Sequence, residues 1–539
     1  MSVDYRIVPT LYDRDGRAYC AALNSPTSSQ VRAKCILPPN KVIPVIFVPG
    51  IMGSNLASTD QLAIDGRAWW PDSTSWALKF RKYTGAQRQQ LLHPDRVRVD
   101  TSAPVDDSAL LKLSGNSRRQ VGDNWKNEFI RRGWGGVMQG SYAGLLCALE
   151  FHLNRMYTAG RVAPDWQELL REQGSNWGEL QGFERLIDSE LSEASEYWYP
   201  VHAVGYNWLA CNSDAGKYLA RFIDLYCDRY RRLGYECDRT ILVTHSMGGL
   251  VARAATHQNL GGAQDKVLGI VHGVQPITGA PAAYKRVRAG NEASGIISAI
   301  AAQVLGWSGA EVAPVFAQSP GPLELLPTKQ YPKGWLQIRR RETGSSQDVL
   351  ALPINDPYEE IYRERDQWWR LMDPALIDPS AQARNPWIGF IKKINIAEAF
   401  HDDLDDYFHP QSWVHYGADP KHQAWGVVRW SSGNNLPRVT NEEMRNARLL
   451  GDNLEGRVKL KVPDERKPDA HRFFWSHAIS NPESAGDGTV PQESGRAAEG
   501  KARFVARMRG FDHQGSFANP QVQSLTLYCI AKIAQQATG

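Results

Sequence analysis

A serine stands in a short pattern, Thr244-His-Ser-Met-Gly248, that could supply a nucleophile for acyl transfer. The pattern follows the apolar, β-branched run 239–244 and precedes the run 250–255, which is typical of a helix. A serine held in a sharp turn between a strand and a helix exposes its hydroxyl, which is the arrangement of a nucleophile elbow. Thr244 replaces the glycine usual at this position, and we expect a short β-branched residue to be accommodated there. We therefore predict that Ser246 is a nucleophile.

A serine hydroxyl is a poor nucleophile unless a base accepts its proton and an acid orients that base. In chains with an elbow of this type, the order along the chain is serine, acid, histidine. His513 lies in a glycine-containing loop before a final apolar helix, and Asp487 lies between two glycines. We predict His513 as the base and Asp487 as the acid. The rivals are His245, whose ring points away from its neighbour on so sharp a turn, and Asp512, which is adjacent to His513 and cannot easily reach the far ring nitrogen.

Acyl transfer also needs N–H donors for the oxyanion that forms on the substrate carbonyl. One donor is expected from Met247, the residue directly after the serine. The other is expected from the loop Pro49-Gly-Ile-Met-Gly53, which ends the apolar run 41–48. Within this loop Ile51 is the first candidate and Met52 the second.

Alternating strand and helix patterns surround these residues and predict an α/β fold. A helix is predicted over 218–233, and a further apolar run follows at 266–274. We expect an α/β-hydrolase core with a mostly parallel central sheet, built from segments of about 36–56, 200–290 and 472–539. Two stretches, about 57–199 and 324–471, break the alternation and are expected to be large, mainly helical or irregular cap insertions. Because no low-complexity linker separates them from the core, we predict one elaborated domain.

The composition narrows the class of protein. The chain has 539 residues, and its net charge of +4 gives no electrostatic reason to expect nucleic acid as a partner. The seven cysteines have no zinc or redox spacing, and we expect mostly reduced thiols in a chain made in the cytoplasm. The start of the chain lacks a secretory signal pattern. The 18 tryptophans are concentrated in the insertions and favour an apolar groove or a contact with lipid.

An uncharged segment, 293–310, could form a lid over an acyl groove. Its apolar residues at helical spacing are the lid candidates Ile296, Ile300, Val304 and Trp307. A buried core helix is the alternative interpretation, since a helix that is apolar all round is usually buried.

The acidic run 401–406, with His409 and His415 beyond it, could be a calcium or zinc site, but it has no recognised metal-loop spacing. A solvated acidic face is the preferred interpretation. No metal and no cofactor is expected, because a serine mechanism requires neither.

Five tracts carry a family resemblance: VPGIMGSNL (48–56), WYPVHAVGYNW (198–208), THSMGGLVAR (244–253), SPGPLELLP (319–327) and GDGTVP (486–491). Together with the His513 loop they resemble the lipase branch of the α/β hydrolases. This branch includes lecithin:cholesterol acyltransferase and the bacterial type VI secretion lipase effectors. The large insertions and the absence of a readable signal peptide are more similar to the bacterial effectors.

The resemblance implies a phospholipase that attacks the membranes of a competing bacterial cell. It implies delivery by a one-step secretion machine into the periplasm or membrane of the target, on a secretion spike or through an adaptor protein, and a cognate immunity protein in the producer. An alternative is a neutral lipid lipase or an acyltransferase similar to lecithin:cholesterol acyltransferase. A third hypothesis, outside the enzymes, is a non-catalytic binding protein on a hydrolase scaffold.

Overall fold

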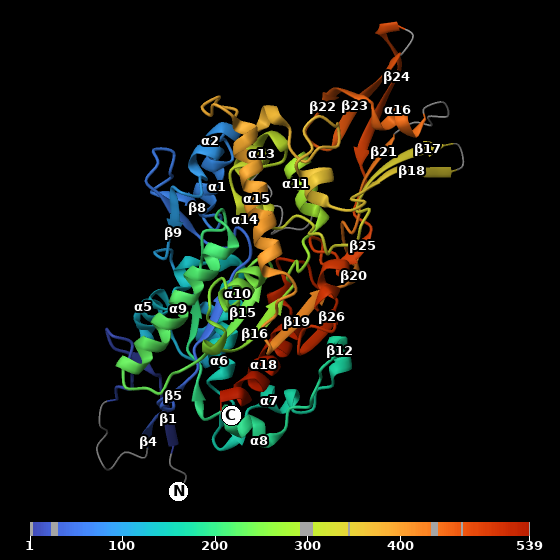
Figure 1. Cartoon of the computed structure of the whole chain (residues 1–539). Helices are drawn as coiled ribbons and strands as arrows, with labels where there is room; N and C mark the ends of the chain where they lie inside the picture. The colour runs from blue at the N-terminus through green and yellow to red at the C-terminus, as the bar shows by residue number, and fades with distance from the viewer. Residues whose placement is uncertain are drawn as a thin grey trace.

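A seven-stranded sheet forms the centre of the lower half of the molecule (Figure 1). The computed structural model describes residues 4–22, 31–290, 306–342, 345–432, 440–464 and 467–537. The strand order is β12 (Glu179–Gln181), β26 (Phe504–Met508), β19 (Ser412–Gly417), β16 (Val267–Gly273), β15 (Thr240–His245), β6 (Val45–Val48) and β14 (Val201–Ala203). All neighbouring pairs are parallel except β12 with β26. The prediction of a mixed α/β fold with a mostly parallel sheet is confirmed.

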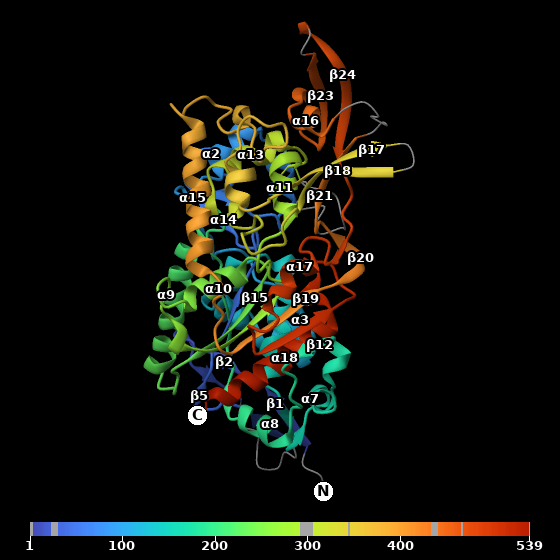
Figure 2. The same ribbon diagram turned by 45° about the vertical axis from the view of Figure 1, so that its right-hand side comes forward.

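Helices cover both faces of this sheet, so its central strands are apolar on both sides. Val45 and Phe47 of β6 belong to the core that contains α6 (Gln139–Leu153) and α18 (Pro520–Ala534). Their neighbours Ile46 and Val48 belong to the core that contains α9 (Asn212–Arg232) and α10 (Gly248–Thr256). Figure 2 shows α9 and α18 on opposite sides of the strands. Alternating side chains of one strand thus hold two helix layers together.

Two strands of the sheet come from ranges predicted as insertions. β12 lies within 57–199, and β19 lies within 324–471, where it occupies a central position between β16 and β26. All six residues of β19 are buried. Five residues, including Pro410, separate the strand from the acidic run, so its local sequence does not stand out as a core strand.

The second insertion supplies five strands and the beginning of the sixth strand of a six-stranded sheet, which differs from the mainly helical or irregular structure expected there. Its order is β18 (Ser345–Leu352), β17 (Leu336–Glu342), β21 (Val428–Ser432), β24 (Lys467–Ile479), β23 (Arg457–Asp464) and β22 (Arg448–Asp452). β17 and β21 are parallel, and the other neighbours are antiparallel. Two of its pairs, β17 with β21 and β21 with β24, join strands far apart in the chain, and such pairing has no local sequence signal.

The first insertion alternates short strands and helices. It contains β7 (Leu56–Ser58), β8 (Arg67–Trp69), α1 (Thr74–Phe80), α2 (Gly85–Leu91), β9 (Val97–Val99), α3 (Ser108–Ser114), α5 (Asn124–Arg131), α6, α7 (Pro164–Leu169) and α8 (Asp188–Ala194). Of these, α1 and α2 lie at the upper end of the molecule in Figure 1, beside helices that follow the core strands in the chain. Those are α11 (Pro281–Ala289), α13 (Gly309–Ala317), α14 (Pro320–Leu323) and α15 (Pro386–Leu404).

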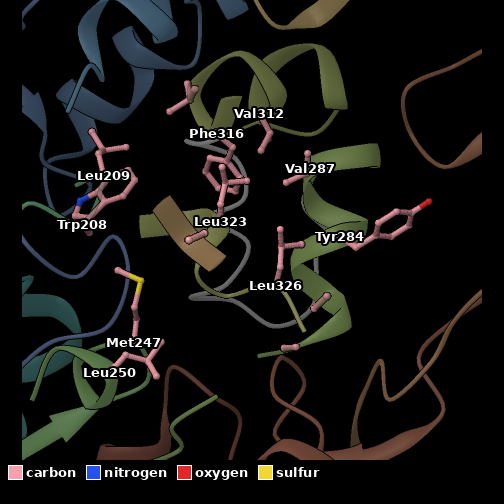
Figure 3. Packing of buried hydrophobic residues seen from close by; sticks show 14 of the residues in the cluster. Trp208, Leu209, Met247, Leu250, Tyr284, Val287, Val312, Phe316, Leu323 and Leu326 are labelled. Carbon is pink, nitrogen blue, oxygen red and sulfur yellow. The ribbon is translucent and has the colours of Figure 1, made fainter. Parts of the chain in front are cut away.

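One apolar cluster connects the sheet to these upper helices (Figure 3). Met247 and Leu250 lie at its lower end, where α10 begins. Leu323 lies above them, and Val312 and Phe316 of α13 lie at the upper end. Because all five side chains are buried in the same cluster, the upper helices and the turn at Ser246 share one core.

Most tryptophans fill the core. Nine of them are among the largest fully buried side chains: Trp69, Trp76, Trp134, Trp166, Trp177, Trp208, Trp335, Trp368 and Trp430. The ring of Trp69 makes edge contacts with Trp76 and Trp208, with centroids 5.7 and 5.3 Å apart. Among tryptophans whose side chains the structure describes, Trp307 alone is exposed, at 39%. The high tryptophan content therefore serves mainly packing, and it no longer favours a lipid groove.

Within the described ranges, no helix combines the length and apolar character needed to cross a bilayer.

The tract 319–327 anchors α14 to the start of α9. A Cβ on Gly321 would lie 2.4 Å from the carbonyl oxygen of Trp208, so only glycine allows this close approach. Glu324 is fully buried, and its Oε2 accepts the Asn212 N–H at 2.8 Å. A side-chain oxygen at a helix N-terminus satisfies one of the free N–H groups there. This tract therefore has a structural role close to the upper helices.

We expect Glu324→Gln to weaken the pH dependence of stability. Burial raises the pKa of Glu324 to about 8, from an ordinary value of 4.5. The folded chain keeps a proton that the unfolded chain releases, so the free energy of unfolding falls as the pH rises from about 4.5 to 8. Glutamine removes this titration but can still accept the Asn212 N–H. Melting temperatures at several pH values should fall less steeply for the variant. Glu168→Gln, at an exposed position, is the control, and equal slopes for all three proteins would refute the expectation.

Candidate active site

Ser246 lies at the tip of a strained turn between β15 and α10. Its φ of 53° falls in the left-handed region, which is costly for a residue other than glycine and is found at functional sites. The turn is tight because Gly248 packs against the end of β6: an added Cβ would lie 2.4 Å from the Val48 carbonyl oxygen. Ser246 keeps 4% of its surface exposed. The residue types of the sequence pattern therefore occupy the geometry of a nucleophile elbow.

Thr244, the departure from the usual pattern, is accommodated beside the next strand. Its Oγ1 lies 3.4 Å from Nδ1 of His272 on β16, and both side chains are fully buried. The hydroxyl therefore has a polar neighbour away from the turn, and the threonine leaves the backbone at Ser246 free to bend.

The structure brings His513 and Asp487 to Ser246 in one chain of hydrogen bonds. His513 Nε2 lies 2.8 Å from Ser246 Oγ, and His513 Nδ1 lies 2.7 Å from Asp487 Oδ2. The other oxygen of Asp487, Oδ1, accepts the N–H groups of Thr489 and Val490 at 3.0 and 2.7 Å. With the carboxylate so held, Nδ1–H of His513 donates to it, and Nε2 is left to accept the serine proton.

Asp487 is positioned by β19, a strand within the range 324–471 that was predicted to be an insertion. It follows β25 (Ser484–Gly486), and β25 pairs with β20 (Asp419–Ala424), which continues from the end of β19. A Cβ on Gly417, the last residue of β19, would lie 2.7 Å from Cβ of Asp487. The acid thus sits against the carboxyl end of a central strand.

Asp512, the rival acid, is a turn residue. Its Oδ1 accepts the Gly515 N–H at 2.7 Å, which is a local contact three residues along the chain.

The loop after β6 lies directly against the serine. A Cβ on Gly50 would lie 3.0 Å from Cβ of Ser246. Neither Ile51 nor Met247 donates its N–H to any group in the described part of the chain. Both groups are therefore available to an oxyanion, as an oxyanion hole requires. The N–H of Met52, the second candidate, is equally available, so the choice between Ile51 and Met52 stays a prediction.

A buried tyrosine and His245 connect this loop to the base, and the sequence did not indicate the connection. The Gly50 N–H donates to Tyr142 Oη at 3.3 Å, and Tyr142 Oη lies 3.0 Å from His245 Nδ1. His245 Nε2 lies 2.9 Å from the His513 carbonyl oxygen. Because a carbonyl only accepts, Nε2 carries the proton and Nδ1 accepts from the tyrosine. Burial, together with repulsion from His513, lowers the pKa of His245 to about 3, so the ring stays neutral.

We expect Tyr142→Phe to lower kcat about 10- to 100-fold, with little change in KM. Loss of the hydroxyl frees the Gly50 N–H and removes the bond that orients His245, so the oxyanion loop and the base shift relative to Ser246. His245→Gln keeps an N–H for the His513 carbonyl and should retain more activity than His245→Leu. Hydrolysis of a soluble short-chain ester measures these effects.

Tyr331→Phe is the matched control for this expectation, because its buried hydroxyl donates to the Gly426 carbonyl in another part of the chain. Equal losses of kcat in Tyr142→Phe and Tyr331→Phe would show that Tyr142 acts only through general stability.

Three of the four lid candidates, Ile296, Ile300 and Val304, lie outside the described residues. Trp307 lies within them and is 39% exposed. The backbone N–H of Trp307 donates to Glu311 Oε2 at 2.7 Å, near the start of α13. The lid therefore stays a prediction.

The acidic run is partly ion-paired and extends from the end of α15. Asp402 pairs with Lys329 at 3.2 Å, and Asp406 pairs with Lys501. His409 Nε2 lies 3.3 Å from the Gln264 carbonyl oxygen, and His415 is buried within β19. Among the described residues, no group of three or more His, Cys, Asp or Glu side chains could hold a metal ion.

The comparison with known proteins relates the whole arrangement to one solved structure. No protein-family model and no curated protein matches the sequence. The structure matches Tle4 in the crystal structure of the Tle4–Tli4 complex with a TM-score of 0.72 and 28% sequence identity, covering 92% of this chain and 98% of that chain. So broad a match includes most of both inserted ranges. The resemblance of this chain to the lipase effectors of type VI secretion, which the sequence motifs predict, is confirmed by this match to Tle4.

Proposed function

We propose that this protein is a serine carboxylester hydrolase of the phospholipase A type that acts on membrane phospholipids. The observation that carries the proposal is the continuous chain of hydrogen bonds from Ser246 through His513 to Asp487, at 2.8 and 2.7 Å. The similarity to Tle4 supports the lipid class of the substrate. Fold similarity alone would not fix the reaction, and the side-chain geometry supplies the chemical argument.

In the proposed mechanism, Ser246 Oγ attacks the ester carbonyl carbon while its proton passes to His513 Nε2. Asp487 orients the ring and stabilises the imidazolium. The Met247 and Ile51 N–H groups hold the oxyanion. When the tetrahedral intermediate collapses, the leaving lysophospholipid takes the proton from His513, and the acyl group stays on the serine. A water molecule, deprotonated by His513, then releases the fatty acid and restores the hydroxyl.

We also propose that the chain is one elaborated hydrolase domain and an antibacterial toxin. In this proposal it travels on a secretion spike, directly or through an adaptor protein, into the periplasm or membrane of a target cell. A cognate immunity protein protects the producer, and the solved complex of Tle4 with Tli4 supports this part. Co-expression of a periplasmic form with its immunity protein should rescue growth of a sensitive host.

Mass spectrometry of reaction products tests the activity. Vesicles of a phospholipid with palmitate at one glycerol position and oleate at the other are incubated with the wild-type protein or with Ser246→Ala. One free fatty acid and the matching lysophospholipid should accumulate with the wild type only. Release of fatty acid from triacylglycerol but not from phospholipid would favour a neutral lipid lipase, and transfer to added sterol would favour an acyltransferase. Absence of both products and of labelling by a fluorophosphonate would favour a non-catalytic protein.

A further inference from the structure

Strands β22, β23 and β24 form an arm, and β23 and β24 extend beyond the upper helices in both views (Figures 1 and 2). β22 is the edge strand of the six-stranded sheet. At its base the arm is fixed to the upper helices, because Arg288 of α11 pairs with Asp452 and the Gly309 N–H donates to the Leu454 carbonyl at 2.7 Å. The arm is therefore a projection whose base is fixed to the upper helices.

The two faces of the arm differ in character. Along β23, Val458 and Leu460 are buried in the apolar cluster that also contains the upper helices, whereas Arg457 and Lys459 are exposed. Successive strand residues point to opposite faces, so these two cations share the outer face. Arg448 of β22 lies opposite Lys461, which places it on the same outer face, and Arg448 is exposed.

These cations differ from the other cations of the same sheet in their partners. Arg339 of β17 pairs with Asp348 at 2.6 Å, and Arg429 of β21 pairs with Glu483 at 2.6 Å. Among the side chains that the structure describes, Arg448, Arg457 and Lys459 form no ion pair. A set of exposed, uncompensated cations on one face attracts an anionic surface.

The neighbouring positions of this outer face are neutral. Lys459 lies opposite Ser476 and Arg457 lies opposite Ala478 on β24. A bulge in β22 leaves Leu450 44% exposed beside the cations. Glu455, in the turn between β22 and β23, is the acid nearest in sequence to Arg457 and Lys459. The net charge of the whole chain is only +4, so this face is a local concentration of charge.

We propose that this outer face is a docking surface for anionic phospholipid membranes. The inference rests on the proposed function, because it names how the enzyme reaches its lipid substrate. Each arginine or lysine near an anionic bilayer strengthens binding several-fold, so three of them together account for about 100-fold in affinity. Leu450 adds apolar contact at the level of the headgroups. The arm thus holds the chain on the membrane while the candidate active site remains in a separate part of the molecule.

Sedimentation with vesicles tests this docking surface. All proteins carry Ser246→Ala, so that the lipid stays intact. The test variant is Arg448→Gln, Arg457→Gln and Lys459→Gln in one chain. The vesicles are phosphatidylcholine with or without phosphatidylglycerol. The parent protein should bind the vesicles with phosphatidylglycerol about 100-fold more tightly, and both the test variant and high salt should remove this preference.

A charge-matched variant separates this surface from the charge of the chain in general. Arg161→Gln, Arg171→Gln and Arg232→Gln neutralise three exposed arginines near the opposite end of the molecule. This control should keep the preference. Equal binding by the test variant and the parent, or equal losses in test and control variants, would overturn the proposal.

With Ser246 restored, the test variant should hydrolyse a soluble short-chain ester at the wild-type rate, which shows that it is folded. An arm variant that loses this activity as well would place the three residues in the fold or the site and overturn the docking role. If the protein binds anionic vesicles through the arm but releases no fatty acid from any phospholipid, the docking surface stands and the proposed phospholipase activity fails.

Discussion

Ser246→Ala is expected to lower kcat for ester hydrolysis by about 10⁶-fold, to a small residual rate. Without Oγ no acyl-enzyme forms, and only the oxyanion donors and substrate binding remain to accelerate attack by water. The fold should be unaffected, because alanine removes one atom and leaves the backbone at φ 53° unchanged. Hydrolysis of a soluble ester and covalent labelling by a fluorophosphonate measure the loss, and the melting temperature reports the fold.

Ser412→Ala is the matched control for this prediction. Ser412 is a fully buried serine at the first residue of β19, and its Oγ has no hydrogen-bond partner among the described residues. Its removal should leave both hydrolysis and labelling at the wild-type level. Turnover close to wild type in Ser246→Ala would disprove the serine mechanism outright.

Asp487→Asn is expected to lower kcat by about 10⁴-fold. The hydrogen bonds of Asp487 explain why an asparagine side chain at this position disables the base. Oδ1 accepts the N–H groups of Thr489 and Val490, so the asparagine must keep its oxygen there and turn its NH₂ group toward His513. His513 Nδ1 must then accept a hydrogen bond, which moves the ring proton to Nε2, where it faces Ser246 Oγ. A ring in this tautomer cannot take the serine proton.

The same substitution at the rival acid provides the comparison. Asp512→Asn disturbs only a turn, in which Oδ1 accepts the Gly515 N–H, and should cost less than about tenfold in kcat. Steady-state kinetics with one soluble ester rank the two variants. A larger loss in Asp512→Asn than in Asp487→Asn would exchange their proposed roles.

Much of the candidate site was readable from the sequence because its signals are local. A β-branched run, a serine between small residues and an apolar helix occupy adjacent positions at 239–255, and the structure forms β15, the turn and α10 from them. The helix predicted over 218–233 is the later part of α9, and the predicted final helix is most of α18. In each case residue type and spacing over a few turns specify the element.

Other features depended on residues far apart in the chain. Tyr142 lies 103 positions from His245 in the sequence, and no local pattern indicates that the Tyr142 hydroxyl connects the Gly50 loop to the base. The alternation of charged and apolar residues at 457–461 could have indicated an amphipathic strand and the cationic face of the arm. The range 324–471 looked irregular because the pairs that close its sheet, β17 with β21 and β21 with β24, join strands far apart in the chain.

The sequence by itself determined the elements around the serine, the order of the proposed serine, acid and base, and the family resemblance. Only the tertiary structure decided that β19 belongs to the central sheet and ends against Asp487, that the strands of the second insertion form a sheet together with β24, and that Tyr142 and His245 connect the two sides of the site. The physical reason is the separation, along the sequence, of the residues that interact. Backbone turns and helix faces follow from neighbouring residues, whereas strand partners and hydrogen bonds between distant side chains exist only after the chain has folded.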